Sequence, residues 1–312
     1  MSIAGALKGK GPNGFGYSST AMQVTEGLDL RGRTILVTGC ASGLGLETIG
    51  ALGARGARVL ATARSLDRAR SATAGLTGDF VPLACELAEP ASIRACVAAV
   101  KDGPPLDAIV CNAGIMAPPA LRQAHGYELQ FFTNHIGHFI LVTALLERLA
   151  PAGRVVVVAS NAHRRAPHGI EFDNLSGERD YAPMRMYGQS KLANVLFTRE
   201  LARRLGTGRT ANCLHPGVIA TNLMRSVPVL GRLALTLATP LVLKTPAEGA
   251  ATQCYLATNP AVAAVTGAYY RDCNPAEPWP VGRDDAAAAR LWETSEAIGV
   301  KLAAPAKLAT PA

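Results

Sequence analysis

The sequence predicts an α/β protein built on a doubly wound parallel sheet, as a single domain of about seven strands with helices on both faces. Short apolar runs alternate with longer helix-like segments from residue 33 onward, and this alternation favours parallel strands joined by right-handed crossovers. Residues 154–160 contain four consecutive valines, which is typical of a strand buried on both faces. A glycine-rich turn at 38–45 follows the first apolar run and would present backbone N–H groups and a helix N-terminus to a phosphate.

The elements of the first half follow in chain order. Residues 1–30 are rich in Gly and Ser and show little periodicity, so we interpret them as an N-terminal extension, with one domain over 31–312. Short runs rich in β-branched or apolar residues predict strands at 33–38, 58–63, 80–85 and 107–112. Between them, longer stretches with helical spacing of apolar residues predict helices at 44–57, 66–74 and 91–100.

The second half continues the same alternation. A long amphipathic helix is expected at 128–149, then the valine-rich strand, and a loop that contains Pro167, Gly169 and Pro183. A helix at 187–205 and a strand at 210–214 follow, and the pattern ends with helices at 246–257 and 284–298 and a strand near 267–271. We find no internal repeat and no linker that would divide the chain.

Composition excludes several classes of protein. The 312-residue chain is 49% hydrophobic and 17% charged, which suits a large core and not a disordered chain. A net charge of +8 is compatible with nucleic acid or a membrane surface as partner. The basic residues form no dense run and are not interleaved with aromatic residues, so we expect no nucleic-acid partner and interpret the charge as suited to an anionic cofactor.

Cysteine usage and hydropathy bear on the compartment. The seven cysteines are odd in number and none has C-x-x-C spacing, which argues against a disulfide framework and a metal site and favours a reducing compartment. Residues 5–16 lack the apolar core of a signal peptide. The longest uncharged apolar stretch, 233–243, is too short to cross a bilayer. We expect a soluble, cytoplasmic protein without a transmembrane segment.

Two residues four apart suggest acid–base chemistry. Tyr187 and Lys191 would share one face of the helix. A tyrosine hydroxyl has a pKa near ~10, and a neighbouring ammonium group favours the phenolate and lowers that pKa. The pair could therefore exchange protons at neutral pH. The spacing alone is equally typical of an exposed pair on a solvated helix.

The order of several motifs resembles the short-chain dehydrogenases/reductases, a family with a Rossmann-type sheet. The resemblance runs from about residue 31 to the C-terminus and rests on residues 38–45, Asn112-Ala113-Gly114, Asn134, Ser160, Tyr187, Lys191 and Pro216-Gly217. The glycine spacing is that of the single-domain branch. Residues 134–139, 159–163, 190–194 and 283–293 look like the retinol dehydrogenase-like branch and its bacterial relatives.

The resemblance implies a role for each of these residues. Tyr187 is expected to be the general acid or base, with Lys191 lowering its pKa and binding the nicotinamide ribose. Ser160 would hold the substrate oxygen, and Asn134 would orient a water of the proton relay. The implied cofactor-binding residues are Gly39, Ser42, Gly43, Leu44 and Gly45 at the pyrophosphate, Glu86 and Leu87 near the adenine, Asn112, Ala113 and Gly114 at the adenosine pocket, and Pro216 and Gly217 over the nicotinamide, besides Tyr187 and Lys191. Glu86 departs from the aspartate that the family usually has there.

The end of the second predicted strand bears on the choice of cofactor. An NAD-binding member would carry an acid there for the ribose 2′-OH, whereas this chain has Ala63 and then Arg64. A guanidinium group suits a 2′-phosphate. We therefore expect NADP(H) as the preferred cofactor, with NAD(H) as the alternative if Arg64 is merely one more arginine in an arginine-rich chain.

An apolar segment at about 222–245 is expected to form a lid over the substrate. Its many Leu and Val residues suit a lipophilic ketone or aldehyde. A helix pair buried against the core or a second subunit, or contact with a membrane, explains the same pattern. His163, Arg164, Arg165 and His168 lie in the loop between Ser160 and Tyr187. Contact with the substrate is one interpretation of them, but we expect exposed charges.

Three other functions compete with a reductase acting on a small molecule. A catalytically silent NADP-binding regulatory protein is the main alternative, although the four polar catalytic positions are all present. A serine hydrolase is disfavoured because no G-x-S-x-G motif occurs, and nucleic-acid binding rests on net charge alone. The resemblance implies a homodimer or homotetramer, unless the terminal segments cover those faces.

Overall fold

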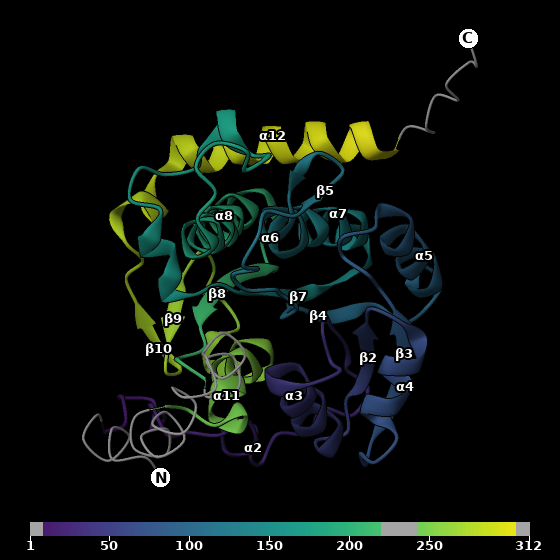
Figure 1. Ribbon diagram of the computed structural model, residues 1–312. Coiled ribbons are helices and arrows are strands. Elements are labelled where there is room, and N and C mark those ends of the chain that lie inside the picture. The colour runs from purple at the N-terminus through teal and green to yellow at the C-terminus, as the bar shows by residue number, and fades with distance from the viewer. Residues whose placement is uncertain (1–8, 220–242, 304–312) are drawn as a thin grey trace, which may run out of the picture.

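Seven parallel strands and one antiparallel strand form the central sheet of the computed structural model, which describes residues 9–219 and 243–303 (Figure 1). The strand order is β10-β9-β8-β7-β4-β1-β2-β3, and β10 pairs antiparallel with β9. The strands are β1 (Thr34–Val37), β2 (Arg58–Ala63), β3 (Asp79–Ala84), β4 (Leu106–Cys111), β7 (Leu149–Val158), β8 (Thr210–His215), β9 (Tyr269–Arg271) and β10 (Asn274–Ala276). Apart from residues 243–245, the predicted lid lies outside the described residues.

Helices cover both faces of the sheet. In Figure 1, α3 and α11 lie on one face, α5, α7 and α8 lie on the other, and α12 crosses outside α7 and α8. The helices are α2 (Ala21–Val24), α3 (Gly43–Ala54), α4 (Leu66–Thr73), α5 (Pro90–Val100), α6 (Leu129–Phe131), α7 (Gly137–Leu145), α8 (Pro183–Arg204), α11 (Pro246–Thr258) and α12 (Asp285–Ala303). A small hairpin of β5 (Gln123–Ala124) and β6 (Tyr127–Glu128) stands beside the sheet.

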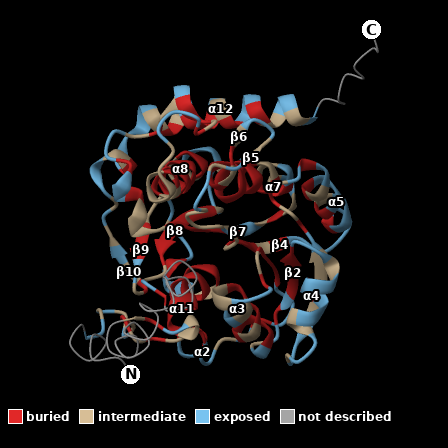
Figure 2. Ribbon diagram, in the orientation of Figure 1, coloured by how far each residue is buried: buried red, intermediate tan, exposed pale blue. Residues whose placement is uncertain are grey.

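Alternate residues of each central strand enter different cores. Ile35 and Val37 of β1 pack with α3 and α11, whereas Leu36 packs with Phe139 of α7 on the other face. All three β1 residues are almost fully buried, and Figure 2 shows further buried residues in β2, β8, α8 and α11. The doubly wound parallel sheet is therefore confirmed.

The sheet has eight strands against the expected number of about seven, because β10 is a three-residue strand that contains Pro275, and such a segment carries no strand signal. One predicted helix needs correction. The helix expected at 128–149 is divided into α6, a π-helical turn at Phe132–Ile136, α7 and a 3₁₀ turn at Leu146–Arg148. Gly137 begins α7 against the loop after β3, where a Cβ atom would lie 2.4 Å from the carbonyl oxygen of Leu87.

One helical stretch of the described residues is long and apolar enough to cross a membrane. It is Leu129–Arg148, and 72% of its apolar window is buried inside the protein. Most of its apolar surface therefore belongs to the core formed with the sheet, α8 and α12.

Part of the N-terminal segment lies against the far end of the chain. The Asn13 side chain donates to the carbonyl of Cys273 at 2.7 Å, and the Asn274 side chain donates to the carbonyl of Phe15 at 3.1 Å. The ring of Phe15 meets that of Tyr255 edge to face, and α2 packs on α11. These contacts hold residues 13–24 against the α11 side of the sheet.

Candidate active site

The site begins where the strand order reverses, between β1 and β4. Thr38, directly after β1, has a buried side chain whose Oγ1 accepts the N–H groups of Asn112 at 2.9 Å and Ala113 at 3.0 Å. The side-chain amide of Asn112 donates in turn to the backbone carbonyl of Thr38 at 2.7 Å. The two loops are therefore held together at the point where ligands bind in sheets of this kind.

The glycines of the first turn let the backbone pack closely against its neighbours at the start of α3. Gly39 has a φ of +74°, and a Cβ there would lie 2.8 Å from Cα of Ala113. A Cβ on Gly45 would lie 2.2 Å from the Gly39 carbonyl oxygen. Ser42 caps α3 without a side-chain hydrogen bond to the helix. The first turn of α3 therefore stays open to an anionic group.

A cavity of about 920 Å³ extends from this turn across the ends of β1, β2, β3 and β4. It unites eleven of the predicted cofactor-binding residues, namely Gly39, Ser42, Gly43, Leu44, Gly45, Arg64, Glu86, Leu87, Asn112, Ala113 and Gly114. A long cavity that starts at an open helix N-terminus fits an extended dinucleotide. The residues present thus suit a nicotinamide cofactor.

Two arginines stand at the rim of this cavity near the end of β2. Arg64 follows the strand directly, and Arg68 lies in the first turn of α4. Both are exposed and both line the cavity. Arg68 is not among the predicted site residues, although the helix predicted at 66–74 begins just after the second strand.

Glu86 and Leu87 line the cavity just beyond the end of β3, the neighbour of β2. The Glu86 carboxylate accepts the N–H of Ala88 at 3.2 Å, and its own N–H donates to Ser92 Oγ at 2.9 Å. The Glu86 side chain therefore stabilises the turn formed by residues 86–88. Leu87 is buried against Gly137.

Tyr187 lies in the second turn of α8, which begins at Pro183, one turn earlier than expected, because proline suits the first helical position. Burial raises the pKa of Tyr187 to about 12, and a hydrogen bond with the Ser160 side chain lowers it in part. Ser160 follows β7 and accepts the N–H of Ala162 at 3.1 Å. Tyr187 and Ser160, 27 positions apart in the sequence, thus meet.

Lys191 lies beside Tyr187, as the helical spacing predicts. Its Nζ is 5.8 Å from the Tyr187 ring centroid and donates to the carbonyl of Val158 at 2.8 Å. Burial lowers the pKa of Lys191 to about 8. The pKa of Tyr187 is raised overall because burial is the largest influence on its hydroxyl.

Asn134 is fully buried in the π-helical turn. Its Oδ1 accepts the N–H of Ile115 at 2.8 Å, and its Nδ2 donates to the Ile115 carbonyl at 3.0 Å and to Ser190 Oγ at 2.9 Å. Ser190 in turn donates to the carbonyl of Tyr187 at 2.8 Å. Asn134 therefore connects the loop after β4 with the helix that carries Tyr187.

The large cavity and the predicted catalytic residues meet at Gly114. A Cβ there would lie 3.1 Å from Asn134 Oδ1 and 3.5 Å from Lys191 Nζ. Pro216 and Gly217 follow β8, the neighbour of β7. Gly217 has a φ of +96°, and a Cβ there would clash with the side chain of Lys244. Both residues therefore lie at the carboxyl end of β8, although neither lines the large cavity.

The expectation for His163 is wrong. Arg164, Arg165 and His168 are exposed, whereas His163 is only 1% exposed. Its Nδ1 lies 2.5 Å from the carbonyl oxygen of Ser160, and its Nε2 accepts the N–H of Trp279 at 2.8 Å. A carbonyl can only accept, so Nδ1 carries the proton. A C-terminal segment far away in the sequence thus holds Ser160 in place, and no local pattern could indicate that contact.

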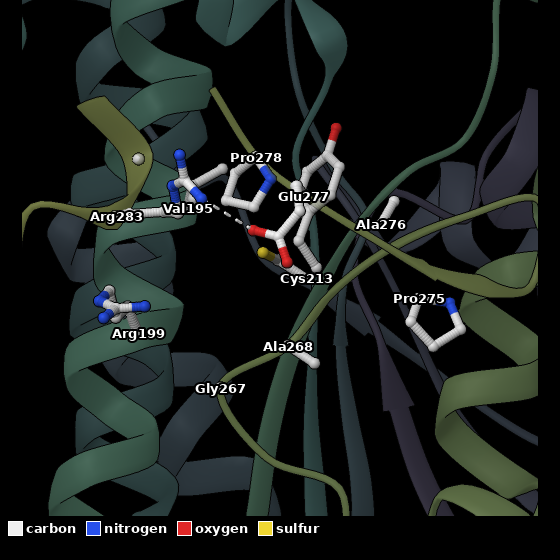
Figure 3. Close-up of a pocket in the computed structure, with 12 residues that line it drawn as sticks. Val195, Arg199, Cys213, Gly267, Ala268, Pro275, Ala276, Glu277, Pro278 and Arg283 are labelled. Carbon is white, nitrogen blue, oxygen red and sulfur yellow. Dashed lines mark hydrogen bonds and ion pairs between the residues drawn. The ribbon is translucent and has the colours of Figure 1, made fainter. Parts of the chain in front are cut away.

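A second cavity of about 340 Å³ lies farther along α8, between that helix and β8, β9 and β10 (Figure 3). Arg283 points toward Glu277, with an N–O distance of 3.3 Å, and Arg199 pairs with Asp285. None of the predicted site residues lines this cavity.

Comparison with known proteins agrees with this geometry. Residues 33–228 match the family model described as short chain dehydrogenase. The chain is 40% identical to human retinol dehydrogenase 14, over 86% of this chain and 87% of that protein. It is 43% identical to a probable oxidoreductase of Streptomyces antibioticus, over 85% of this chain and 97% of that protein.

A solved structure agrees with the fold. A putative uncharacterized protein from Mycobacterium paratuberculosis is 31% identical, with a TM-score of 0.73, over 91% of this chain and 98% of that chain. The matching fold, the family model and the related sequences lead to one conclusion: the chain belongs to the short-chain dehydrogenase/reductase family, and it is similar to retinol dehydrogenases.

Proposed function

We propose that this protein is an NADP(H)-dependent oxidoreductase that interconverts a carbonyl compound and an alcohol, with Tyr187 as general acid or base. The observation that carries the proposal is the contact at Gly114, where the cavity suited to a dinucleotide reaches Asn134 and Lys191. A cofactor that fills this cavity would end beside the proton-donating groups. That is the arrangement a carbonyl reduction needs.

Each polar residue has a distinct task in this proposal. Tyr187 donates a proton to the carbonyl oxygen, and the Ser160 hydroxyl holds that oxygen by a hydrogen bond. The positive charge of Lys191 favours the phenolate left after the proton has gone, and Asn134 orients the groups between Ile115 and Ser190. When bound, the nicotinamide would supply the hydride.

Preference for NADP(H) rests on two arginines. Arg64 and Arg68 both line the cavity at the end of β2, where the 2′ position of the adenosine ribose lies in sheets of this kind. Neither has an ion-pair partner among the interactions of the described residues. Two unpaired guanidinium groups suit a phosphate dianion.

A lipophilic substrate is the class we propose. The apolar composition of residues 222–245 supports it, as do relatives named retinol dehydrogenase 14 and 12. A cytoplasmic location is supported by seven buried cysteine thiols. We retain a homodimer or homotetramer as the proposed assembly. The main alternative function is a catalytically silent NADP-binding regulatory protein.

The test measures NADPH consumption against apolar aldehydes and ketones and against small hydrophilic ones, with NADH in parallel. We expect turnover of apolar carbonyls with NADPH, and loss of turnover in Tyr187→Phe with retained NADPH binding. NADPH binding without turnover of any carbonyl would favour the regulatory alternative. Preferential turnover of hydrophilic ketones would exclude the lipophilic substrate class.

A further inference from the structure

His138 bridges the two loops that the site depends on. Its imidazole is 1% exposed. Nε2 lies 2.9 Å from Thr38 Oγ1 in the cofactor-binding turn, and Nδ1 lies 2.9 Å from the carbonyl oxygen of Asn134 in the π-helical turn. Residues 38 and 134 thus share one imidazole ring.

The partners of this ring determine where its proton is. The Asn134 carbonyl can only accept a hydrogen bond, so Nδ1 must carry a hydrogen. Burial lowers the pKa of His138 to about 4, and the ring is therefore neutral near pH 7, which leaves Nε2 as an acceptor. The hydroxyl of Thr38 consequently donates to Nε2.

The bonds of Thr38 agree with this assignment. Its Oγ1 already accepts two N–H groups, from Asn112 and Ala113, and it has one proton to donate. The carbonyl of Val110 is 3.4 Å away, whereas His138 Nε2 is 2.9 Å away. The shorter contact takes the proton. A directed series of hydrogen bonds then runs from the N–H groups of Asn112 and Ala113 through Thr38 and His138 to Asn134.

We propose that His138 is a positioning residue that locks the cofactor-binding turn to the catalytic turn through its Nδ1–H tautomer. This inference rests on the proposed function, because it assigns the two turns to the cofactor and to catalysis. The bond to Thr38 fixes the hydroxyl that holds Asn112 and Ala113 at the cavity wall. The bond to Asn134 fixes the backbone of the residue that connects Ile115 with Ser190 and Tyr187.

The neighbouring histidine provides a matched control. His135 is also 1% exposed and lies on the same π-helical turn, but its Nε2 contacts Ser295 Oγ of α12 at 2.8 Å. It contacts neither Thr38 nor Asn112. If each histidine acted only through packing, replacing either one should have the same effect. The proposed role predicts an effect on the site for His138 alone.

Two substitutions separate the two bonds of His138. In His138→Asn the amide nitrogen occupies the place of Nδ1 and keeps the donor to Asn134, but it is too short to reach Thr38. In His138→Gln the amide oxygen reaches the position of Nε2 and can accept from Thr38. His138→Leu removes both bonds.

The experiment combines NADPH titration by fluorescence, steady-state kinetics and ¹⁵N NMR of the imidazole rings in the full chain. For His138→Leu we expect a ten-fold or greater fall in kcat and a several-fold rise in the NADPH dissociation constant. His138→Asn should recover most of kcat, with the NADPH dissociation constant still raised. His138→Gln should recover most of the NADPH affinity, with kcat still lowered. His135→Gln should lower the thermal midpoint and leave kcat and NADPH binding near the wild-type values.

Two results would overturn the proposal. One is an equal loss of stability in His138→Leu and His135→Gln, with kcat and NADPH affinity unchanged in folded His138→Leu. The other is an NMR spectrum that places the His138 proton on Nε2, or one that titrates between pH 5.5 and 8. If the wild-type protein turns over no carbonyl, the proposed function fails, yet the NMR spectra and the NADPH titrations still test the bridge.

Discussion

The side-chain amide of Gln253 lies 3.2 Å from Oδ1 of Asn112. Gln253 is fully buried in α11, and its Nε2 also donates to the hydroxyl of Thr48 in α3. One amide therefore connects α11 with both the first helix and the loop after β4. The wall of the cofactor cavity thus depends on a residue 141 positions farther along the chain.

Replacing Gln253 should weaken cofactor binding. In Gln253→Leu, Asn112 loses a buried hydrogen bond worth about 1 kcal/mol, or more if the group stays unpaired. We expect the NADPH dissociation constant to rise about 5-fold or more, as measured by fluorescence titration. Thr258→Ala is the control, because that hydroxyl bonds only the backbone of its own helix. An unchanged affinity in folded Gln253→Leu would contradict the role given to this amide.

Arg64 and Arg68 should determine the choice between the two cofactors. Each charge-assisted bond to a phosphate contributes roughly 1.5–3 kcal/mol. We therefore expect Arg64→Ala and Arg68→Ala each to raise the KM for NADPH about 10-fold and to leave the KM for NADH nearly unchanged. Arg70→Ala, an exposed arginine on the same helix that does not line the cavity, serves as the control. Equal effects on NADPH and NADH would mean that neither arginine reads the 2′-phosphate.

The buried ammonium group of Lys191 should lower the stability of the folded protein, although we propose that it takes part in the reaction. Burial lowers its pKa from 10.5 to about 8, which corresponds to roughly 3 kcal/mol against the charged form. The Val158 carbonyl keeps a second donor, Asn194, at 3.2 Å. We expect Lys191→Met to be inactive and at least as stable as the wild type to urea at pH 7.

The pH dependence of this stability difference gives a second check on Lys191. Between pH 8 and 10.5 the unfolded chain holds a proton that the folded chain has lost, so wild-type stability rises with pH. The advantage of Lys191→Met should therefore shrink over that interval. A Lys191→Met protein much less stable than the wild type at pH 7 would show that the ammonium group stabilises the fold.

Acid should destabilise the protein through buried histidines. Burial lowers the pKa of His135 to about 3 and those of His138 and His215 to about 4. The unfolded chain binds protons below pH 6.5 and the folded chain does not, so stability falls from about pH 6.5 to 4. Each group contributes up to about 1.4 kcal/mol per pH unit.

Urea unfolding at several pH values measures this slope. We expect His135→Gln to reduce the slope by about one proton. A stability that does not change between pH 6.5 and 5 would be inconsistent with neutral, buried imidazoles.

Local patterns were sufficient to predict most of the sheet and the residues around it. The meeting of the turn at Gly39 with Ala113 follows from where parallel strands end, whereas the joint role of Tyr187 and Ser160 is implied only by the resemblance to the family. A turn that joins a strand to a helix is a local structure and can be predicted from nearby residues. The loop after the adjacent parallel strand lies at the same edge of the sheet, because the crossovers are regular.

Long-range contacts were not predictable in this way. Gln253, His138 and His163 act through partners that lie 141, 100 and 116 positions away. In the sequence Gln253 and His138 are polar residues inside apolar segments, which indicates a buried bond without naming the partner, whereas His163 stands among polar and charged residues. The raised pKa of Tyr187 also depends on how deeply the tertiary structure buries the hydroxyl.

The strand order also constrains how quickly the chain can reach this structure. In the main sheet only β9 and β10 are joined as a hairpin, whereas the central pair β1 and β4 brings together Ile35 and Ala108. Pairing of strands so distant in sequence has to close a long loop before any contact compensates for the lost chain entropy. We therefore expect slow refolding from urea, during which unpaired apolar strands are open to self-association, so that dilution of the chain should raise the yield of native protein.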